Sequence, residues 1–211
     1  MSAVSDIPAA TGWAAFAAAR THAIRGLRGR VLEIGAGQGA NFGALDRDVE
    51  WLGLEPSSRR CGSLAENARR HGHRAPPLQA GAESIPLPDA DVDAVLATTV
   101  LCSVRDQAQV LAEIARVLGP GGRLVLAEHV AAPPGSLARA AQRVARPWTR
   151  LFDHGCDPTR DTEAAVRSSP LRIDTCTRFA VPVLGSLAVP FLVIEATKPA
   201  GPRPHTTGSA S

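Results

Sequence analysis

The sequence lacks the features that mark several large classes of protein. Its four cysteines, Cys61, Cys102, Cys156 and Cys176, follow no spacing typical of a zinc site or of a thioredoxin-like pair. We therefore predict reduced thiols, a cytoplasmic protein and no bound metal. The N-terminus has neither a basic start nor a long apolar run, which predicts that the chain has no signal peptide and no membrane anchor.

The excess of positive charge is also small. Lys and Arg total 23 against 20 Asp and Glu, and the basic residues are scattered rather than gathered in a block. Such an excess does not indicate a nucleic-acid partner. What the chain does have is apolar content, 45% of 211 residues, which is enough to bury one sizeable core.

Short apolar runs alternate with helical stretches along the first two thirds of the chain. The runs are bounded by glycine or aspartate, as strands of a buried parallel sheet are, and they lie at 31–34, 51–55, 92–98 and 123–130. Amphipathic helices are expected at 9–28, 57–70 and 106–118, the last two capped by Ser57 and Asp106. The pattern predicts an α/β fold with a mostly parallel sheet, and a glycine-rich turn at 119–122.

The last third of the chain is less regular. We expect a helix at 137–152, a polar segment before a short helix ending at Ser168, and a strand at 171–179. The polar segment has two interpretations: Asp157 could cap the short helix, or a site could form from Asp153, His154, Cys156, Asp157 and Arg160. A final strand is expected at 190–198, with 181–189 as a long connection. Residues 199–211 are polar and rich in Pro and Gly, which predicts a disordered tail.

Three glycines in five positions follow the first predicted strand. Gly35, Gly37 and Gly39 allow a tight turn with backbone N–H groups facing a ligand above the sheet. The same glycines fit a dinucleotide fingerprint, and Glu55 at the end of the second strand suits a ribose in either case. Glu33, inside the first strand, favours a cofactor with one nucleoside and a cationic end over NAD.

The motifs together resemble those of class I S-adenosylmethionine-dependent methyltransferases. The resemblance rests on E-x-G-x-G-x-G at 33–39, on Glu55 and on LGPGGRLVLAEHV at 118–130. GANF at 39–42, VLCSV at 100–104, EHVAA at 128–132 and LFDHGCDPTR at 151–160 are similar to the methyltransferase-like family whose animal members are thiol S-methyltransferases. The likeness covers about residues 30–198 and stops at the N-terminus, where those animal proteins carry a membrane anchor.

The resemblance implies a fold and a division of the chain. The fold is a single doubly wound, Rossmann-like α/β domain with a mostly parallel seven-stranded sheet, helices on both faces and possible reversal of the last strand. The chain then divides into an N-terminal helical cap (1–29), a class I methyltransferase domain (30–198) and the disordered tail (199–211).

The resemblance also implies roles for single residues. Glu55, followed by Pro56, would hold the ribose hydroxyls of S-adenosylmethionine, and Glu33 would lie near its methionine end, with Gly35, Gly37 and Gly39 passing beneath. After a weak third strand, Ala82 and Glu83 would hold the adenine, and Thr98 would begin the wall beside the transferable methyl.

Each of these residues also has a purely structural interpretation. Glu55 could cap the helix beginning at Ser57, Glu33 could pair with an arginine, and Glu83 could cap a turn. For Cys102, burial as a small apolar residue is favoured over a place in the wall of the methyl pocket.

The sequence thus predicts transfer of a methyl group from S-adenosylmethionine to a small molecule, with a thiol as the leading acceptor. O- or N-methylation is the alternative and would need a base, for which His129 and His154 compete. A thiol needs only to be ionised, which Arg160 or Arg105 could favour. An NAD-dependent oxidoreductase and a non-catalytic cofactor-binding domain are weaker alternatives, and the oligomeric state is left open.

Overall fold

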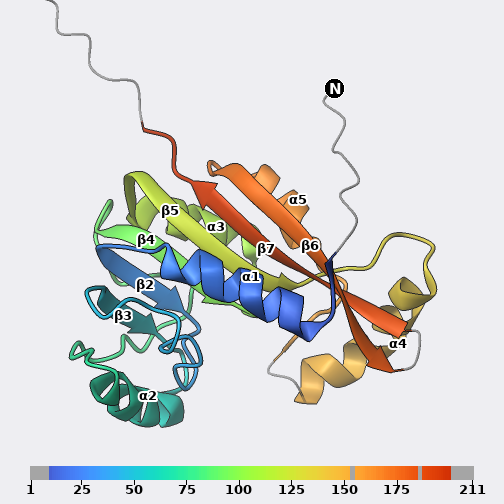
Figure 1. Ribbon diagram of the computed structural model, residues 1–211, viewed down its shortest axis with the longest axis horizontal. Coiled ribbons are helices and arrows are strands. Elements are labelled where there is room, and N and C mark those ends of the chain that lie inside the picture. Colours follow the sequence, from blue (N-terminus) through green and yellow to red (C-terminus); the bar gives the residue numbers. More distant parts are fainter. Residues whose placement is uncertain (1–9, 153–154, 185–186, 201–211) are drawn as a thin grey trace, which may run out of the picture.

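The computed structural model describes residues 10–152, 155–184 and 187–200. Within these ranges the strands form one seven-stranded sheet in the order β1-β6-β7-β5-β4-β2-β3 (Figure 1). The strands are β1 (Ala10–Thr11), β2 (Arg30–Ile34), β3 (Glu50–Leu54), β4 (Val92–Thr98), β5 (Leu118–His129), β6 (Arg172–Leu184) and β7 (Leu187–Thr197). The helices are α1 (Trp13–Arg25), α2 (Ser58–Arg70), α3 (Gln107–Val117), α4 (Leu137–Phe152) and α5 (Thr162–Arg167).

The centre of the sheet is parallel and the C-terminal side is antiparallel. β2 pairs in parallel with both β3 and β4, and β4 pairs in parallel with β5. β7 runs antiparallel to both β5 and β6. The prediction of a doubly wound α/β fold with a mostly parallel sheet is confirmed, as is the reversal of the last strand.

The seven strands are not the seven that the sequence predicts. The weak third strand before Ala82 is absent from the described sheet, and only an isolated bridge between Leu54 and Leu78 forms there. Six polar, proline or glycine residues interrupt this stretch from 76 to 84, so it offers no apolar run to bury. The seventh strand is instead the two-residue β1, which pairs with β6 at the sheet edge.

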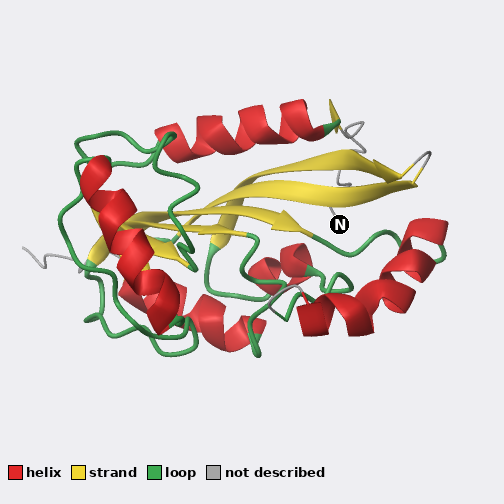
Figure 2. Ribbon diagram, turned by 90° about the horizontal axis from the view of Figure 1, so that it is seen from below, coloured by secondary structure: helices red, strands yellow, loops and turns green. Residues whose placement is uncertain are grey.

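Two apolar clusters cover the two faces of the sheet. On one face, Phe16 and Ile24 of α1 and Leu64 of α2 pack against β2, β4 and β5. On the other, Ile114 of α3 and Val166 of α5 pack against the opposite sides of the same strands. Figure 2 shows α1 lying along one side of the sheet, with α3 and α5 on the other. The expected helices on both faces are therefore present.

The helix starts agree only partly with prediction. Asp106 caps α3 by accepting hydrogen bonds from the N–H groups of Ala108 and Gln109, as expected. Ser57 precedes α2 without a side-chain cap, and its backbone N–H donates to Glu55 Oε1. Asp157 does not cap the helix that ends near Ser168: that cap is Asp161, whose carboxylate accepts from Ala164.

Two predicted boundaries between strands and turns are wrong. The glycine-rich stretch 119–122 falls inside β5 rather than before it, as an irregularity between the pair Leu118–Val92 and the next pair, Arg123–Ala94. The predicted connection 181–189 is largely strand, because β6 and β7 stay paired from Val181–Val189 to Leu184–Leu187. Of the tail 199–211 that is predicted to be disordered, residues 201–211 lie outside the described residues. No helix in the described ranges is both long and apolar enough to span a membrane.

Candidate functional site

The site lies where the parallel strands end and the chain order reverses between β2 and β4. Open α/β sheets bind ligands at this switch point. A cavity of about 430 Å³ opens there, which we call the glycine-loop cavity, and this volume suits a small molecule. Of the predicted cofactor residues, the following line it: Gly35, Gly37, Glu55, Pro56, Ala82, Glu83 and Thr98.

The glycine loop reaches the cavity without side chains. Gly37 has a φ of +58°, and a Cβ added there would meet only the carbonyl oxygen of Gly35, at 3.8 Å. Gly39 has a φ of +84° and plays a different part, because a Cβ there would lie 1.9 Å from the ring of Phe42. Gly37 therefore keeps ligand space open, whereas Gly39 permits close packing beneath the loop.

Glu55 has a buried carboxylate that ties the loop to the start of α2. Its Oε2 accepts from the N–H of Gly37 at 3.1 Å, and its Oε1 accepts from the N–H of Ser57 at 2.9 Å. Arg60 Nε donates to the same Oε1 at 3.0 Å. The capping interpretation and the ligand interpretation thus describe one residue, because this carboxylate lines the glycine-loop cavity while holding the helix start. Arg60 lines the cavity too and was not predicted.

Glu33 is placed differently from the expectation. Its carboxylate is buried beside the strands, where it accepts from Asn41 Nδ2 at 2.8 Å and from Trp51 Nε1 at 2.7 Å. Burial raises the pKa of this carboxyl, and the two hydrogen bonds oppose that rise. Glu33 is not among the lining residues of the glycine-loop cavity, and neither is Gly39.

Asn41 connects Glu33 to the cavity wall. The same Nδ2 that donates to Glu33 also donates to Thr98 Oγ1, at 3.0 Å, and Thr98 lines the glycine-loop cavity. Sequence reasoning missed Asn41, although it stands in the GANF segment that carries part of the family resemblance. Any influence of Glu33 on a ligand would pass through this amide.

The predicted adenine wall is held in place by the next helix. Glu83 Oε1 accepts from the N–H of Arg105 at 2.8 Å, and its carbonyl oxygen accepts from Gln109 Nε2 at 3.3 Å. The carboxylate therefore joins two walls of the glycine-loop cavity. A role toward adenine stays a prediction, as do the other ligand roles.

A second, more apolar cavity of about 740 Å³ adjoins the first, and we call it the cysteine–histidine cavity. The two share Thr99 and Ser103 as lining residues. The walls of the second cavity come from α1, α4, β7, the end of β5 and the loops around them. They include Trp13, Phe16, Cys102, His129, Ala141, Gln142, Cys156 and Phe191. The structure thus places the predicted base His129 next to the first cavity but outside it.

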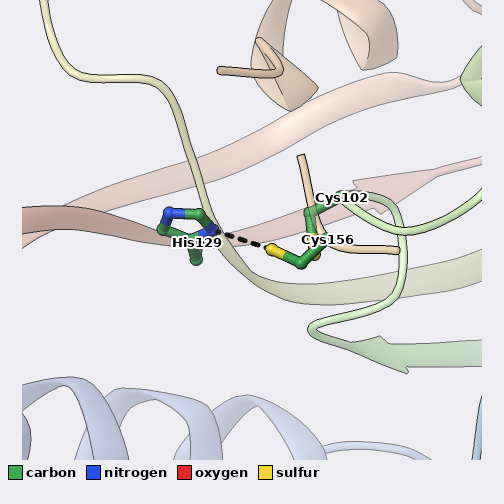
Figure 3. Close-up of side chains that lie close together, drawn as sticks. All are labelled: Cys102, His129 and Cys156. Atoms are coloured by element: carbon green, nitrogen blue, oxygen red, sulfur yellow. Dashed lines mark hydrogen bonds between the residues drawn. The ribbon is translucent and has the colours of Figure 1, made fainter. Parts of the chain in front are cut away.

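Cys102, His129 and Cys156 meet in this second cavity. Cys156 Sγ lies 3.8 Å from His129 Nδ1, and Figure 3 shows these two side chains pointing toward one another, with Cys102 beside them. Cys102 is buried, as favoured, and it also lines the cavity. A hydrogen bond with Cys156, together with burial, raises the pKa of the Cys102 thiol far above its usual range.

Glu128 fixes the loop that separates the two cavities. This fully buried carboxyl accepts at Oε1 from the N–H groups of Val100 and Leu101, at 2.9 and 3.1 Å. Burial raises its pKa to about 8. Thr99, just before these residues, has a φ of +54°, which is strained for a β-branched residue. Sequence reasoning missed Glu128, because an acid in a buried strand gives no sign of its partners.

The remaining predicted residues lie near the second cavity or outside the described ranges. His154 is outside the described residues. Asp157 accepts from Thr159 and pairs with Arg146 Nε at 3.0 Å. The Arg160 guanidinium donates to the carbonyl oxygens of Leu101 and Arg105. It therefore stabilises the loop between the two cavities rather than facing the second cavity.

Comparison with known proteins gives the family. A methyltransferase-domain model matches residues 32–126. The thiol S-methyltransferase TMT1B of Rattus norvegicus is 39% identical over 137 residues, which cover 63% of this chain and 55% of that protein. The phosphatidylethanolamine N-methyltransferase of Cereibacter sphaeroides is 30% identical over 163 residues, covering 72% of this chain and 79% of that protein. The chain spans little more than half the length of the thiol S-methyltransferases that it matches.

Among solved structures, a geranyl diphosphate C-methyltransferase from Streptomyces coelicolor shares the fold. The TM-score is 0.66, the identity is 15%, and the match covers 86% of this chain and 76% of that one. That protein was solved in complex with S-adenosyl-L-homocysteine. The matched domain, the N-methyltransferase relative and the common fold agree with the glycine loop and its acidic partner: the chain belongs to the S-adenosylmethionine-dependent methyltransferase family.

Proposed function

We propose that this protein transfers a methyl group from S-adenosylmethionine to the thiol of a small, largely apolar molecule. The observation that carries the proposal is the pair of adjoining cavities, one beside the glycine loop and one lined by apolar side chains, which share Thr99 and Ser103. Two substrates bound in these cavities would meet at the shared wall, as direct transfer requires.

The glycine-loop cavity supplies the groups that S-adenosylmethionine needs. Glu55 offers a carboxylate to the ribose hydroxyls, and Gly37 leaves room for the chain to pass close beneath the ligand. Glu83 offers an acceptor to the adenine amino group. Part of the binding energy would replace hydrogen bonds that Glu55 now makes with Arg60 and Ser57.

The choice of a thiol rests on the relatives and on the second cavity. The rat and human relatives are named thiol S-methyltransferases. A thiolate is a strong nucleophile once ionised, so the cavity need not supply a strong base. In the reaction, the acceptor sulfur attacks the methyl carbon in line, and S-adenosylhomocysteine leaves. Exclusion of water and alignment would account for most of the rate enhancement.

An amine acceptor is the second candidate, and one observation favours it. The N-methyltransferase of Cereibacter sphaeroides is the relative matched over the larger share of its own length. A protonated amine must lose a proton before it attacks, and His129 lines the cavity where that base would be needed.

The test is mass-spectrometric detection of S-adenosylhomocysteine with a panel of apolar thiols, amines and phenols, beside calorimetric titration of S-adenosylmethionine. We expect cofactor binding and turnover with thiols. Turnover with amines alone would replace the thiol proposal by the second candidate, and no cofactor binding by a folded protein would overturn both. A cytoplasmic location and the lack of a nucleic-acid partner stay predictions.

A further inference from the structure

Cys102, His129 and Cys156 form a compact group of metal-ligating atoms. One ligand atom from each of the three lies within 4.8 Å of the other two. The residues come from the loop after β4, the end of β5 and the segment between α4 and α5. Neighbouring members of the group are 27 residues apart in the sequence, so no short sequence motif predicts the group.

We propose that these three side chains bind a zinc ion whose fourth coordination position opens into the cysteine–histidine cavity and accepts the substrate thiol as a thiolate. The proposal deepens the proposed function and rests on it for the identity of the acceptor. The metal site itself follows from the three side chains alone.

The ligand chemistry selects the ion. Two thiols and an imidazole suit zinc, whereas magnesium and calcium take oxygen ligands. Structural zinc sites use four protein ligands, while catalytic sites keep three and leave one position for water or substrate. Two cysteines and one histidine are one of the combinations found in catalytic sites. A group of three, open to a cavity, therefore indicates a reactive site.

The spacing of the atoms is close to that of a tetrahedral site. Zinc–sulfur bonds of about 2.3 Å and zinc–nitrogen bonds of about 2.1 Å place neighbouring ligand atoms about 3.6 to 3.8 Å apart. Cys156 Sγ and His129 Nδ1 are 3.8 Å apart. Since the whole group fits within 4.8 Å, the other distances need to shorten by at most about 1 Å, which side-chain rotation can supply.

Backbone hydrogen bonds hold the three segments together. The N–H of Asp157 donates to the carbonyl oxygen of Cys102 at 2.9 Å, which joins the two cysteine segments. The N–H of Ala131 donates to the carbonyl oxygen of Arg160 at 2.9 Å, which joins the same segment to the chain after β5. Glu128 ties β5 to the loop that carries Cys102. The ligands are thus held near binding geometry by their surroundings.

The open position faces the substrate space. All three ligand residues line the cysteine–histidine cavity, which adjoins the glycine-loop cavity through Thr99 and Ser103. On binding, the acceptor R–SH would give its proton to solvent and its sulfur to zinc. A sulfur lone pair then forms the bond to the methyl carbon as the carbon–sulfonium bond breaks. The products are the neutral thioether R–S–CH3, a weaker ligand that departs, and S-adenosylhomocysteine.

The first test is metal binding by the full, reduced, metal-depleted chain. We expect it to bind one zinc ion in competition with a chromophoric chelator. Cobalt(II) should give a thiolate-to-cobalt charge-transfer band that changes when an acceptor thiol is added. Cys102→Ser and Cys156→Ser should each weaken zinc binding at least about 100-fold, more than loss of an outer-shell partner does. Cys176→Ser, a cysteine outside the group, is the matched control and should bind zinc like the wild type.

A second measurement uses only the wild-type protein, in case a variant fails to fold. Zinc should protect Cys102 and Cys156 from alkylation, mapped by peptide mass spectrometry, and should leave Cys61 and Cys176 reactive as before. Zinc binding that is no tighter in the wild type than in the two serine variants would overturn the site. So would a Cys102–Cys156 disulfide in fresh protein that leaves no zinc bound.

Turnover separates the two proposals. Thiol methylation that is lost on zinc removal and restored by zinc, with unchanged S-adenosylmethionine binding, supports both. Full thiol methylation by zinc-free protein would keep the proposed function and overturn the role of zinc. The cobalt band with no methylation of any thiol would overturn the proposed acceptor while the metal site stands.

Discussion

The two cavities are built by opposite means. The glycine-loop cavity is shaped by backbone and by residues close to strand ends, and its central carboxylate, Glu55, is held by two backbone N–H groups and one arginine. The cysteine–histidine cavity is lined by side chains from α1, α4, β7, the end of β5 and two loops. The atoms that shape the glycine-loop cavity can therefore shift little without disturbing the backbone. The shape of the cysteine–histidine cavity can instead be changed by replacing one side chain at a time.

This difference matches the demands of the two substrates. Every family member must bind the same cofactor, so a backbone-built cavity serves all of them. Acceptors differ, as the names of the relatives show, from thiols to phosphatidylethanolamine. Side chains on separate elements can change one at a time without disturbing the glycine loop.

The largest effect is expected at the cofactor end. Glu55→Ala should weaken S-adenosylmethionine binding at least about tenfold, because charge-assisted hydrogen bonds are worth about 1.5 to 3 kcal/mol. Calorimetric titration measures the change. Glu55→Gln is the matched variant, since it keeps the shape and loses the charge. If both variants bind the cofactor like the wild type while folded, the carboxylate is structural and the ribose role is wrong.

The sequence predicts the residues of the glycine-loop cavity much better than those of the cysteine–histidine cavity. Gly35, Gly37 and Glu55 stand at fixed distances from predicted strands, so their meeting at one sheet edge follows from the fold class. The meeting of Cys102, His129 and Cys156 depends instead on the pairing of β4 with β5 and on the path of the chain after α4. No local pattern encodes either.

Glu33 and Asn41 mark the limit of motif reasoning at the cofactor end. The motif places an acid in the first strand, but the direction of its side chain is set by Trp51 on the neighbouring strand, which donates to its Oε2. A hydrogen-bond partner on another strand cannot be predicted from the spacing of residues along a single strand. Asn41, in the loop after β2, is the residue that carries the connection to the cavity.

Asn41→Ala tests that connection and should lower the free energy of unfolding by about 1 to 3 kcal/mol, the cost of leaving a buried acceptor unsatisfied. The effect should depend on pH. Because burial raises the pKa of Glu33 in the folded state, its contribution to stability is full at low pH and falls as pH rises through the folded pKa. Asn41→Ala removes a hydrogen-bond donor to the ionised carboxylate and so makes this fall in stability steeper. The free energy of unfolding lost in the variant should therefore be larger at pH 8 than at pH 5.

Urea unfolding at the two pH values gives the comparison. Asn67→Ala is the control, since its amide donates to Gln38 in an exposed bond of similar length, 2.9 Å. Asn67→Ala should lower the free energy of unfolding much less than Asn41→Ala does, and by the same amount at pH 5 and pH 8. Equal losses for Asn41→Ala at pH 5 and pH 8 would contradict a role in holding the ionised carboxylate.

A smaller effect is expected at Glu113, which supports the wall of the glycine-loop cavity from behind. Its carboxylate accepts from the N–H of Ile85 and pairs with Arg116, which in turn donates to the carbonyl oxygens of Ile85 and Leu87. The hydrogen bond from Arg116 lowers the pKa of Glu113. Its contribution to stability is therefore present above the unfolded pKa and lost as pH falls through the folded value.

Glu113→Gln should lower the free energy of unfolding by about 1 to 2 kcal/mol at pH 7, and the difference from wild type should shrink below about pH 4. Thermal and urea unfolding across this pH range measure it. Glu66→Gln removes an exposed ion pair with Arg70 and should cost no more than about 0.5 kcal/mol. A constant loss at every pH would show that packing, not charge, accounts for Glu113.

The smallest effect on stability, and the sharpest test of the shared wall, is expected at Thr99. Its positive φ is strained for a β-branched residue, so Thr99→Gly should raise the free energy of unfolding by up to about 1 kcal/mol, net of the entropy lost on ordering a glycine.

Ala90→Gly is the matched control, because Ala90 has a φ of +55° and lines neither cavity. Both variants should gain stability, but only Thr99→Gly should lower kcat, because a looser wall misaligns the two substrates. Steady-state kinetics and unfolding of the two variants separate the outcomes. Equal kcat in both would mean that alignment is set by the cavities themselves and not by the strained residue between them.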